Sequence, residues 1–442
     1  MRNKAGKKNI GRRDFLRTSL AAAAAAGITS SFEYARAAVS PGITITGMYR
    51  TQIRGLGGII VRLETNKGIT GYGECRDLDR GSRAMLDTFA PHIVGKNPTD
   101  IESIYNTMME HYTFPENMAN LEQSGTGAVS GIETACWDIM GKVNNVPVYK
   151  LLGTRLRDKI PMYADTDSNQ HEDVVSRVEK GFKHYKCDMY LSRIARGNYT
   201  TSETPNNFGY REITINQAGL DQMHAYMEEY RNTLKSFGEP YASAPVGSDH
   251  YQGYNARDQI SVESAIALAN TLHDHNPNGY VEDIIDWWID DCSGLPSKAV
   301  ADGTEMGIQT GEDMFGFEQC KRFSDIGAFT NFHPEPNTFG GLNQTLMASK
   351  YADSKGVVTY HHNSSGPLAM ASYAHLAAVT PGFVAMEYHQ MDRLWHDDMI
   401  DGVEKPMIQD GFTFVPEGPG LGVTLNAEQL EAHNASEWTK II

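Results

Sequence analysis

The chain has 442 residues and a formal net charge of −16. This length exceeds one average domain, so a barrel of roughly 250 residues with a smaller second domain is the economical interpretation. The acidic balance argues against nucleic acid or an anionic membrane surface as a partner, because sequence-independent binding to either needs a basic face. It does not exclude an anionic substrate, since a bound metal ion can invert the local sign of the field.

Residues 1–37 have the composition of a targeting segment. Lysines precede the run Gly11-Arg12-Arg13-Asp14-Phe15-Leu16-Arg17, an alanine-rich apolar run follows, and Ala35-Arg36-Ala37 resembles a cleavage site. This order resembles a twin-arginine export signal and predicts a periplasmic protein. The alternative is an amphipathic N-terminal helix with a chance arginine pair. The apolar run is too short for a permanent membrane anchor.

Residues 43–155 read as a small α+β unit. Apolar and polar residues alternate over residues 43–75 around a glycine-containing turn, which predicts a hairpin region. From about residue 84 to residue 150 the period becomes helical, and the segment 131–141 carries its apolar residues on one face. Pro147 and Gly153 then break the pattern, and a new strand begins near Arg157, so a domain boundary is expected near residue 155.

In the second part of the chain, acidic residues and a histidine recur at the ends of short apolar runs. They stand 23 to 33 residues apart, at Asp249, Glu282, Glu312, Glu335, His362 and Glu387. Such a period fits one strand, one helix and two loops, and a parallel barrel gathers the C-terminal ends of its strands on one face. The first three carboxylates would repel one another there unless a divalent cation lay among them. Ligation by oxygen alone suits magnesium better than zinc.

An ordered set of motifs resembles the enolase superfamily, in particular the mandelate racemase branch with its acid-sugar dehydratases. The motifs are Gly71-Tyr72-Gly73-Glu74, the helix from Gly131 to Asp138, the segment 147–153 with Arg157-Asp158, Gly340-Gly341 and Pro419-Gly420-Leu421-Gly422. The resemblance extends from about residue 43 to residue 425. It implies an α/β fold, with a modified (β/α)7β TIM-type barrel over residues 156–399. An α+β capping domain over residues 38–155 would be completed by residues 400–442.

The resemblance also implies a chemistry, the removal of the proton α to a carboxylate. That proton is too weakly acidic for a side-chain base alone, and the developing charge needs a divalent cation nearby. The implied ligands of one Mg²⁺ per chain are Asp249, Glu282 and Glu312, from the third, fourth and fifth strands.

His362, at the end of the seventh strand, is the implied base, and Glu335 at the end of the sixth would hold its imidazole. Because side chains alternate along a strand, only one of His361 and His362 can face the site, and the following Asn363 favours His362. An alternative for Glu335 is that it only caps a loop.

The second strand departs from the racemase pattern Lys-x-Lys, since this chain has Lys186-Cys187-Asp188. Lys186 and Asp188 share the inward face, while Cys187 points to the helices. Lys186 can hydrogen-bond a substrate carboxylate, whereas an Asp188 of low pKa would be a poor base, which disfavours two-base racemisation. Glu387, on the eighth strand, matches the position that, protonated or bridged, hydrogen-bonds the substrate carboxylate, and its neighbours could keep it neutral.

The next two residues of the chain after Asp249, His250 and Tyr251, are candidates for the proton donor. Tyr251 shares the inward parity of Asp249 and can protonate a leaving hydroxide, and His250 is a candidate only if the strand bulges. His250 and Asp188 are also predicted to bind the substrate. A purely structural role for Tyr251 is equally open. The segment 192–219 has no strong periodicity, and as an insertion on the catalytic face it could act as a lid.

These features favour a magnesium-dependent lyase, an acid-sugar dehydratase. His362 would remove the proton α to a sugar-acid carboxylate, and the β-substituent would leave with acid help from Tyr251, His250 or His362 itself. Three alternatives stay open: β-elimination of uronate-containing oligosaccharides, epimerisation or cycloisomerisation, and a non-catalytic periplasmic sugar-acid binding protein. The expected partner is a small sugar acid or uronate, and the resemblance implies a homo-oligomer.

Overall fold

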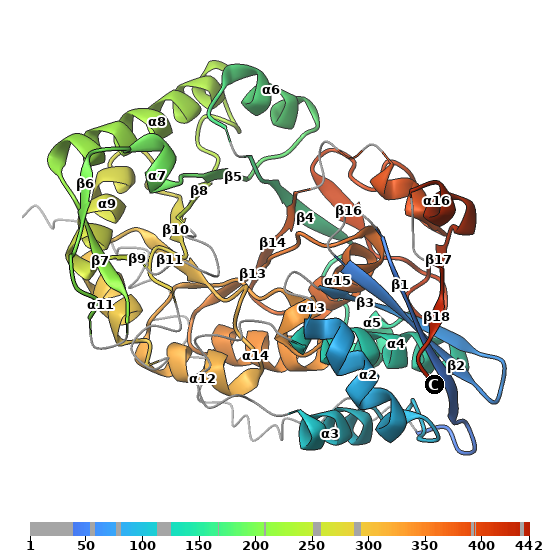
Figure 1. Ribbon diagram of the computed structural model, residues 1–442. Helices are drawn as coiled ribbons and strands as arrows, with labels where there is room; N and C mark the ends of the chain where they lie inside the picture. The colour runs from blue at the N-terminus through green and yellow to red at the C-terminus, as the bar shows by residue number, and fades with distance from the viewer. Residues whose placement is uncertain are drawn as a thin grey trace, which may run out of the picture.

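The computed structural model describes residues 39–53, 58–76, 81–112, 125–166, 168–206, 209–250, 258–286, 293–389, 393, 395–433 and 437–442. The targeting-like segment 1–37 lies outside this part of the chain. Figure 1 shows a ring of strands surrounded by helices, with an antiparallel sheet and its own helices beside the ring. No helix within the described ranges is long and apolar enough to cross a membrane.

The smaller body is an antiparallel sheet covered by helices. Its strand order is β18 (Thr439–Lys440), β1 (Ile45–Gln52), β2 (Gly58–Thr65) and β3 (Thr70–Arg76). The helices are α2 (Gly81–Ile93), α3 (Ile101–His111), α4 (Thr126–Asn144) and the single turn α5 (Tyr149–Leu152). Helix α4 packs directly on β3, and a Cβ at Gly71 or Gly73 would lie 2.2 or 2.0 Å from a carbonyl oxygen of α4. Glycine in this strand therefore permits the close approach of helix and sheet.

The larger body is a closed parallel barrel. In the described residues its eight strands follow the order β4 (Lys159–Ala164), β5 (Tyr185–Asp188), β8 (Val246–Asp249), β10 (Tyr280–Glu282), β11 (Gly307–Thr310), β12 (Asn331–Phe332), β13 (Val358–His361) and β14 (Phe383–Tyr388). Strand β14 pairs in parallel with β4 and closes the ring. The predicted fold class, a TIM-type barrel with a capping domain, is confirmed.

Helices surround this ring on the outside (Figure 1). They are α6 (His171–Glu179), α8 (Gln217–Ser236), α9 (Val262–His273), α11 (Leu295–Gly303), α12 (Phe317–Ile326), α14 (Leu342–Ser354) and α15 (Pro367–Val379), with the short turns α7 (Leu191–Ile194) and α13 (Pro336–Phe339). Inside the ring, Tyr163, Tyr280 and Tyr360 form a separate buried aromatic cluster. Side chains thus fill the barrel below the polar site, as in other barrels of this size.

The segment 192–219 contains regular structure that its sequence did not predict. Strands β6 (Tyr199–Thr201) and β7 (Arg211–Ile215) form a hairpin, and β7 pairs in parallel with β9 (Asp258–Ile260). Arg211 donates to both oxygens of Asp258, at 2.8 and 2.9 Å. Strands this short carry too few residues for an alternation to stand out, and the role of the segment as a lid stays a prediction.

The C-terminal segment contacts both bodies. Strand β16 (Phe412–Phe414) pairs with β4 of the barrel, whereas β18 pairs with β1 of the capping domain. The segment also contains the 3-10 turn η2 (His396–Met399), the antiparallel pair β15 (Ile400–Asp401) and β17 (Thr424–Leu425), and the helix α16 (Ala427–Ala432).

Two buried glutamates of the capping domain cap helices of the barrel. Glu133 accepts hydrogen bonds from the backbone amides of Leu342 and Asn343, at 2.9 and 3.1 Å, at the start of α14. Glu74 does the same for Gly366 and Ala369 at the start of α15, at 2.6 and 3.1 Å. Neither helix has a side-chain cap from its own N-cap residue. The capping domain therefore satisfies amides that a helix start leaves without intrahelical partners.

Candidate active site

The candidate site lies where the barrel strands end, and the strand register brings its acids together. Asp188 pairs with Asp249 across β5 and β8, and Asp249 pairs with Glu282 across β8 and β10. Because these residues occupy one row of neighbouring parallel strands, their side chains enter the same space.

Lys186 is fully buried beneath this row and links three carboxylates. Its Nζ lies 3.0 Å from Asp249 Oδ2, 3.0 Å from Glu282 Oε1 and 2.7 Å from Glu387 Oε1. Burial disfavours the ammonium, but Asp249, Glu282 and Glu387 together raise the pKa of Lys186 well above its usual value. Lys186 therefore faces inward as expected and is a protonated countercharge in the middle of the acids.

The three predicted metal ligands, Asp249, Glu282 and Glu312, are all buried. In the described part of the chain, ligand atoms of Glu282, Glu312 and His333 lie within 4.8 Å of one another. Asp249 is not part of that group, although its carboxylate and that of Glu282 both lie 3.0 Å from Lys186 Nζ. Another group with this spacing, His362, Glu387 and His389, is rich in nitrogen and suits zinc rather than magnesium.

The acids around Glu282 and Glu312 fit a hard divalent cation. Asp283 follows Glu282, is buried, and its Oδ1 has no hydrogen-bond partner among the residues that the structure describes. Burial, and then the charges of Glu312, Glu282 and Asp313, raise the pKa of Asp283 well above its usual value. Such a concentration of carboxylates requires positive charge, and its oxygen donors are those that Mg²⁺ prefers.

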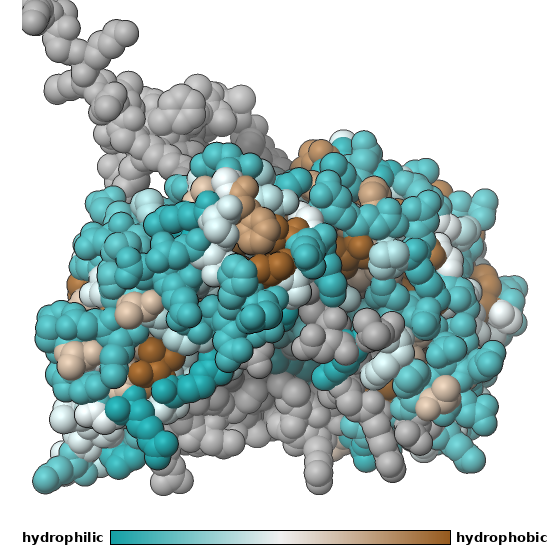
Figure 2. Space-filling model, turned by 90° about the horizontal axis from the view of Figure 1, so that it is seen from above, coloured by the Kyte–Doolittle hydropathy of each residue, from teal (hydrophilic) through white to brown (hydrophobic). Residues whose placement is uncertain are grey.

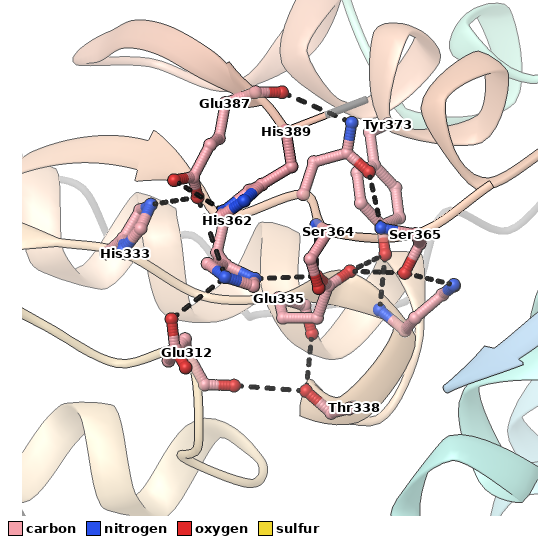
Figure 3. A network of polar contacts seen from close by, with 12 residues as sticks. Glu312, His333, Glu335, Thr338, His362, Ser364, Ser365, Tyr373, Glu387 and His389 are labelled. Atoms are coloured by element: carbon pink, nitrogen blue, oxygen red, sulfur yellow. Dashed lines mark hydrogen bonds and ion pairs between the residues drawn. The ribbon is translucent and has the colours of Figure 1, made fainter. Parts of the chain in front are cut away.

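His362 lies between two carboxylates, as Figure 3 shows. Its Nδ1 is 2.7 Å from Glu335 Oε2, and its Nε2 is 2.9 Å from Glu312 Oε2. Burial favours the neutral ring, but Glu312 and Glu387 raise the pKa of His362 to about 10. Glu335 is itself held by the hydroxyl of Tyr373, so the orientation of the imidazole is fixed from behind. The contact predicted between His362 and Glu335 is present, while their catalytic roles stay predictions.

His361 faces away from the site, as the alternation of side chains predicted. Within the described part of the chain neither of its ring nitrogens has a hydrogen-bond partner, and its ring packs edge-on against Phe383 with centroids 4.9 Å apart. Burial lowers the pKa of His361 to about 3. The neighbouring histidines thus have opposite environments, one apolar and one acidic.

Two expectations about acidity are not supported. Burial alone would raise the pKa of Glu387, but Lys186, His389 and His362 hold it well below its usual value, so the predicted neutral form is wrong. Burial and the charges of Asp165 and Asp249 raise the pKa of Asp188 to about 8. A low pKa therefore cannot be the reason for regarding Asp188 as a poor base.

The structure tests only one of the two proton-donor candidates that follow Asp249. Tyr251 lies outside the described residues. His250 is buried with Nε2 3.1 Å from Ser248 Oγ, and its backbone amide donates to Glu282 O at 3.0 Å, continuing the ladder without a bulge. Because Ser248 and His250 share the strand face opposite to Asp249, the geometry does not support the substrate-binding role predicted for His250.

Sequence reasoning missed two histidines of the site. His333 has Nδ1 3.1 Å from Glu282 Oε1 and Nε2 2.6 Å from the hydroxyl of Tyr163. His389 has Nδ1 2.9 Å from Asp165 Oδ2 and Nε2 2.9 Å from Glu387 Oε1. Each stands two residues from a predicted site acid, Glu335 or Glu387, so the same alternation that selected His362 could have found them.

Comparisons with known proteins agree with this architecture. Residues 172–430, more than half of the chain, match the model of the enolase C-terminal domain-like family. Residues 43–153 match that of the mandelate racemase/muconate lactonizing enzyme N-terminal domain.

Among curated relatives, the chain is 26% identical over 387 residues to a D-xylonate dehydratase of Haloferax volcanii, which covers 85% of each protein. It is 25% identical over 417 residues to a D-galactonate dehydratase family member of Musicola paradisiaca, covering 87% of this chain and 93% of the relative. A solved mandelate racemase/muconate lactonizing enzyme-like protein from Rubrobacter xylanophilus superposes with a TM-score of 0.75 at 24% identity, over 88% of this chain and 97% of that one. The chain therefore belongs to the enolase superfamily, in its mandelate racemase/muconate lactonizing enzyme branch, near the acid-sugar dehydratases.

Proposed function

We propose that the protein is a magnesium-dependent acid-sugar dehydratase. It removes the proton α to the carboxylate of a sugar acid and eliminates the β-hydroxyl as water. The observation that carries this proposal is an imidazole, His362, held by Glu335 at 2.7 Å and lying 2.9 Å from the buried acid Glu312 through its other ring nitrogen. The names of the relatives, a D-xylonate dehydratase and a D-galactonate dehydratase family member, support the same reaction and substrate class.

Asp249, Glu282 and Glu312 would hold one magnesium ion per chain. The ion would supply positive charge for the negative charge that develops on the substrate carboxylate during proton removal. Lys186 lies against Asp249, Glu282 and Glu387, so it keeps these acids ionised and close together. Its remaining role is to attract the anionic substrate into the site.

His362 must be neutral to remove the proton, whereas in the metal-free site the charges of Glu312 and Glu387 raise its pKa to about 10. A cation held by Glu312 would offset the charge that favours the protonated ring. Glu335 accepts the hydrogen of Nδ1, so the lone pair lies on Nε2, the atom that faces the cavity. Without substrate, Nε2 lies against Glu312, and entry of the sugar acid must replace this contact. Elimination of the β-hydroxyl then yields an enol, which tautomerises to a 2-keto-3-deoxy acid.

The test is a screen of purified protein with Mg²⁺ against a panel of sugar acids that includes D-xylonate and D-galactonate. We expect a 2-keto-3-deoxy acid from at least one of them. We expect no product with His362→Asn and normal turnover with the matched control His224→Asn, which changes a histidine of the outer helix α8. Unchanged turnover in His362→Asn would contradict the proposal. Exchange of the α-proton with solvent deuterium without loss of water would instead select epimerisation.

The proposal extends to the place of action. The order of features in residues 1–37 supports export by the twin-arginine route, so the sugar acid would be met in the periplasm. A homo-oligomer is the expected assembly. Figure 2 shows a mostly hydrophilic face on which hydrophobic side chains form small separate groups, so this face offers no large apolar contact in its described part.

A further inference from the structure

Two imidazoles, each held by a carboxylate, flank Glu387. His362 is held through Nδ1 by Glu335 at 2.7 Å, and His389 is held through Nδ1 by Asp165 at 2.9 Å. The Nε2 atoms face Glu387, at 3.6 Å for His362 and 2.9 Å for His389. The two rings are 5.7 Å apart, and Figure 3 shows His362, Glu387 and His389 converging on one space. The function proposed above uses only the first of these pairs.

The position of the second pair is set by the seam that closes the barrel. Tyr388 of β14 pairs with Ala164 of β4, and the next residue on each strand is His389 and Asp165, respectively. The backbone amide of Asp165 donates to Tyr388 O at 3.4 Å, which extends the ladder by one step. His389 therefore stands on the rigid end of the barrel wall, where a catalytic group is held most accurately.

The surroundings of His389 make it a proton donor. Both of its ring nitrogens lie 2.9 Å from carboxylate oxygens, those of Asp165 and Glu387, and these charges favour a hydrogen on each nitrogen. The Nε2 of His362 also faces a carboxylate, but that acid is Glu312, an implied metal ligand whose charge a bound cation would offset, whereas Glu387 is not one of the three implied ligands. The ring therefore holds a proton on Nε2, toward the cavity. The side chain of His389 is 28% exposed and that of His362 is 3% exposed, so His389 lies on the side from which water can leave.

We propose that His389, oriented by Asp165, is the general acid that protonates the departing β-hydroxyl. This inference rests on the proposed dehydratase function and assigns the acid that the function requires. His362 takes the proton from C2, the C2–H electrons form the C2–C3 double bond, and the C3–O bond breaks. The oxygen leaves with the bonding electrons and takes the proton of His389 Nε2, so that water and an enol are formed.

The same geometry returns the enzyme to its starting state. After elimination His362 carries the extra proton and His389 lacks one. A ring nitrogen of each and an oxygen of Glu387 lie within 4.8 Å of one another, so the proton can pass back between them. Glu387 thus acts between two imidazoles, which explains why an ionised acid lies at this place.

The experiment compares two leaving groups. The panel acid that the wild type dehydrates, D-xylonate or D-galactonate in the first instance, is assayed beside its 3-deoxy-3-fluoro analogue. Fluoride leaves as an anion and needs no proton, whereas hydroxide does. We expect His389→Asn to lose about 100- to 10,000-fold in water elimination, the usual contribution of a general acid, and to keep fluoride release close to the wild-type rate. His362→Asn, which lacks the base, should lose both reactions.

Asp165→Asn is the second variant, and it keeps the proposal testable if His389→Asn does not fold. As a positioning residue, Asp165 should affect water elimination and leave fluoride release unchanged, a split that a general loss of structure would not give. His224→Asn should change neither rate.

Three results would overturn the assignment. His389→Asn could dehydrate at the wild-type rate, it could lose fluoride release as fully as water elimination, or the wild type could carry a stoichiometric zinc ion that His389→Asn loses. In each of these cases wild-type dehydration still supports the dehydratase function. If the wild type neither dehydrates nor exchanges the α-proton, the proposed function itself fails and the role of His389 fails with it.

Discussion

Replacing Glu133 by glutamine tests how the capping domain is held to the barrel. Its carboxylate is completely buried and accepts three hydrogen bonds, from Trp137 Nε1 at 2.7 Å and from the amides of Leu342 and Asn343. Burial raises the pKa of Glu133 from 4.5 to about 7, although these three donors act in the opposite direction. The folded protein therefore binds a proton here that the unfolded chain releases at a lower pH.

The sign and size of the effect follow from this difference. Because the folded pKa is the higher one, the group contributes its full stability below pH 4.5 and loses it as the pH rises through about 7. The difference between 4.5 and about 7 corresponds to about 3 kcal/mol. Glutamine has the shape of the neutral acid and cannot ionise, so Glu133→Gln should lack this part of the pH dependence.

The assay is urea denaturation of wild type and variant between pH 4.5 and 8. We expect the stability of the wild type relative to Glu133→Gln to fall by about 3 kcal/mol across this range. Glu428→Gln, on the exposed start of α16, controls for the loss of one negative charge. A difference that is flat with pH would refute the reasoning, because it would mean that the three donors outweigh burial and keep Glu133 ionised throughout.

Three further predictions concern the site and the targeting segment. Lys186→Met leaves Asp249, Glu282 and Glu387 without their shared ammonium, so the free energy of unfolding should fall by about 3 to 5 kcal/mol. Thermal denaturation in EDTA measures this loss, and an unchanged melting temperature would contradict it. Removal of divalent ions with EDTA should lower the melting temperature of the wild type and abolish product formation, and excess Mg²⁺ should restore both; full activity in EDTA would exclude the magnesium proposal. Changing Arg12 and Arg13 together to lysine should keep the protein in the cytoplasm, and cell fractionation that finds it still in the periplasm would reject the twin-arginine interpretation.

The barrel and the main acids could be predicted because each signal is local. An acid at the end of an apolar run marks a strand end, and the closed sheet brings those ends together whatever the loops do. His362 was separated from His361 by the alternation of side chains, and the two rings indeed lie in opposite environments.

The remaining parts depend on contacts between distant segments. Burial and the charge of Asp165, on the neighbouring strand end, raise the pKa of Asp188. Burial alone would raise the pKa of Glu387, but Lys186 and His362 from other strand ends, and His389 just beyond its own strand, lower it. Tyr373, which holds Glu335, lies on helix α15, and no pattern in its own segment indicates that contact. Such effects follow from packing in three dimensions and leave no periodic signal in the sequence.

The two glutamates that reach across to α14 and α15 also limit how the chain can be recombined. A chimera that joins this barrel to the first domain of a relative would lose both helix starts unless the donor carried acidic residues at the places of Glu74 and Glu133. Whether such a hybrid folds should therefore depend on these two positions, which lie outside the substrate site. Donor domains can be chosen by checking first that they carry an acidic residue at both.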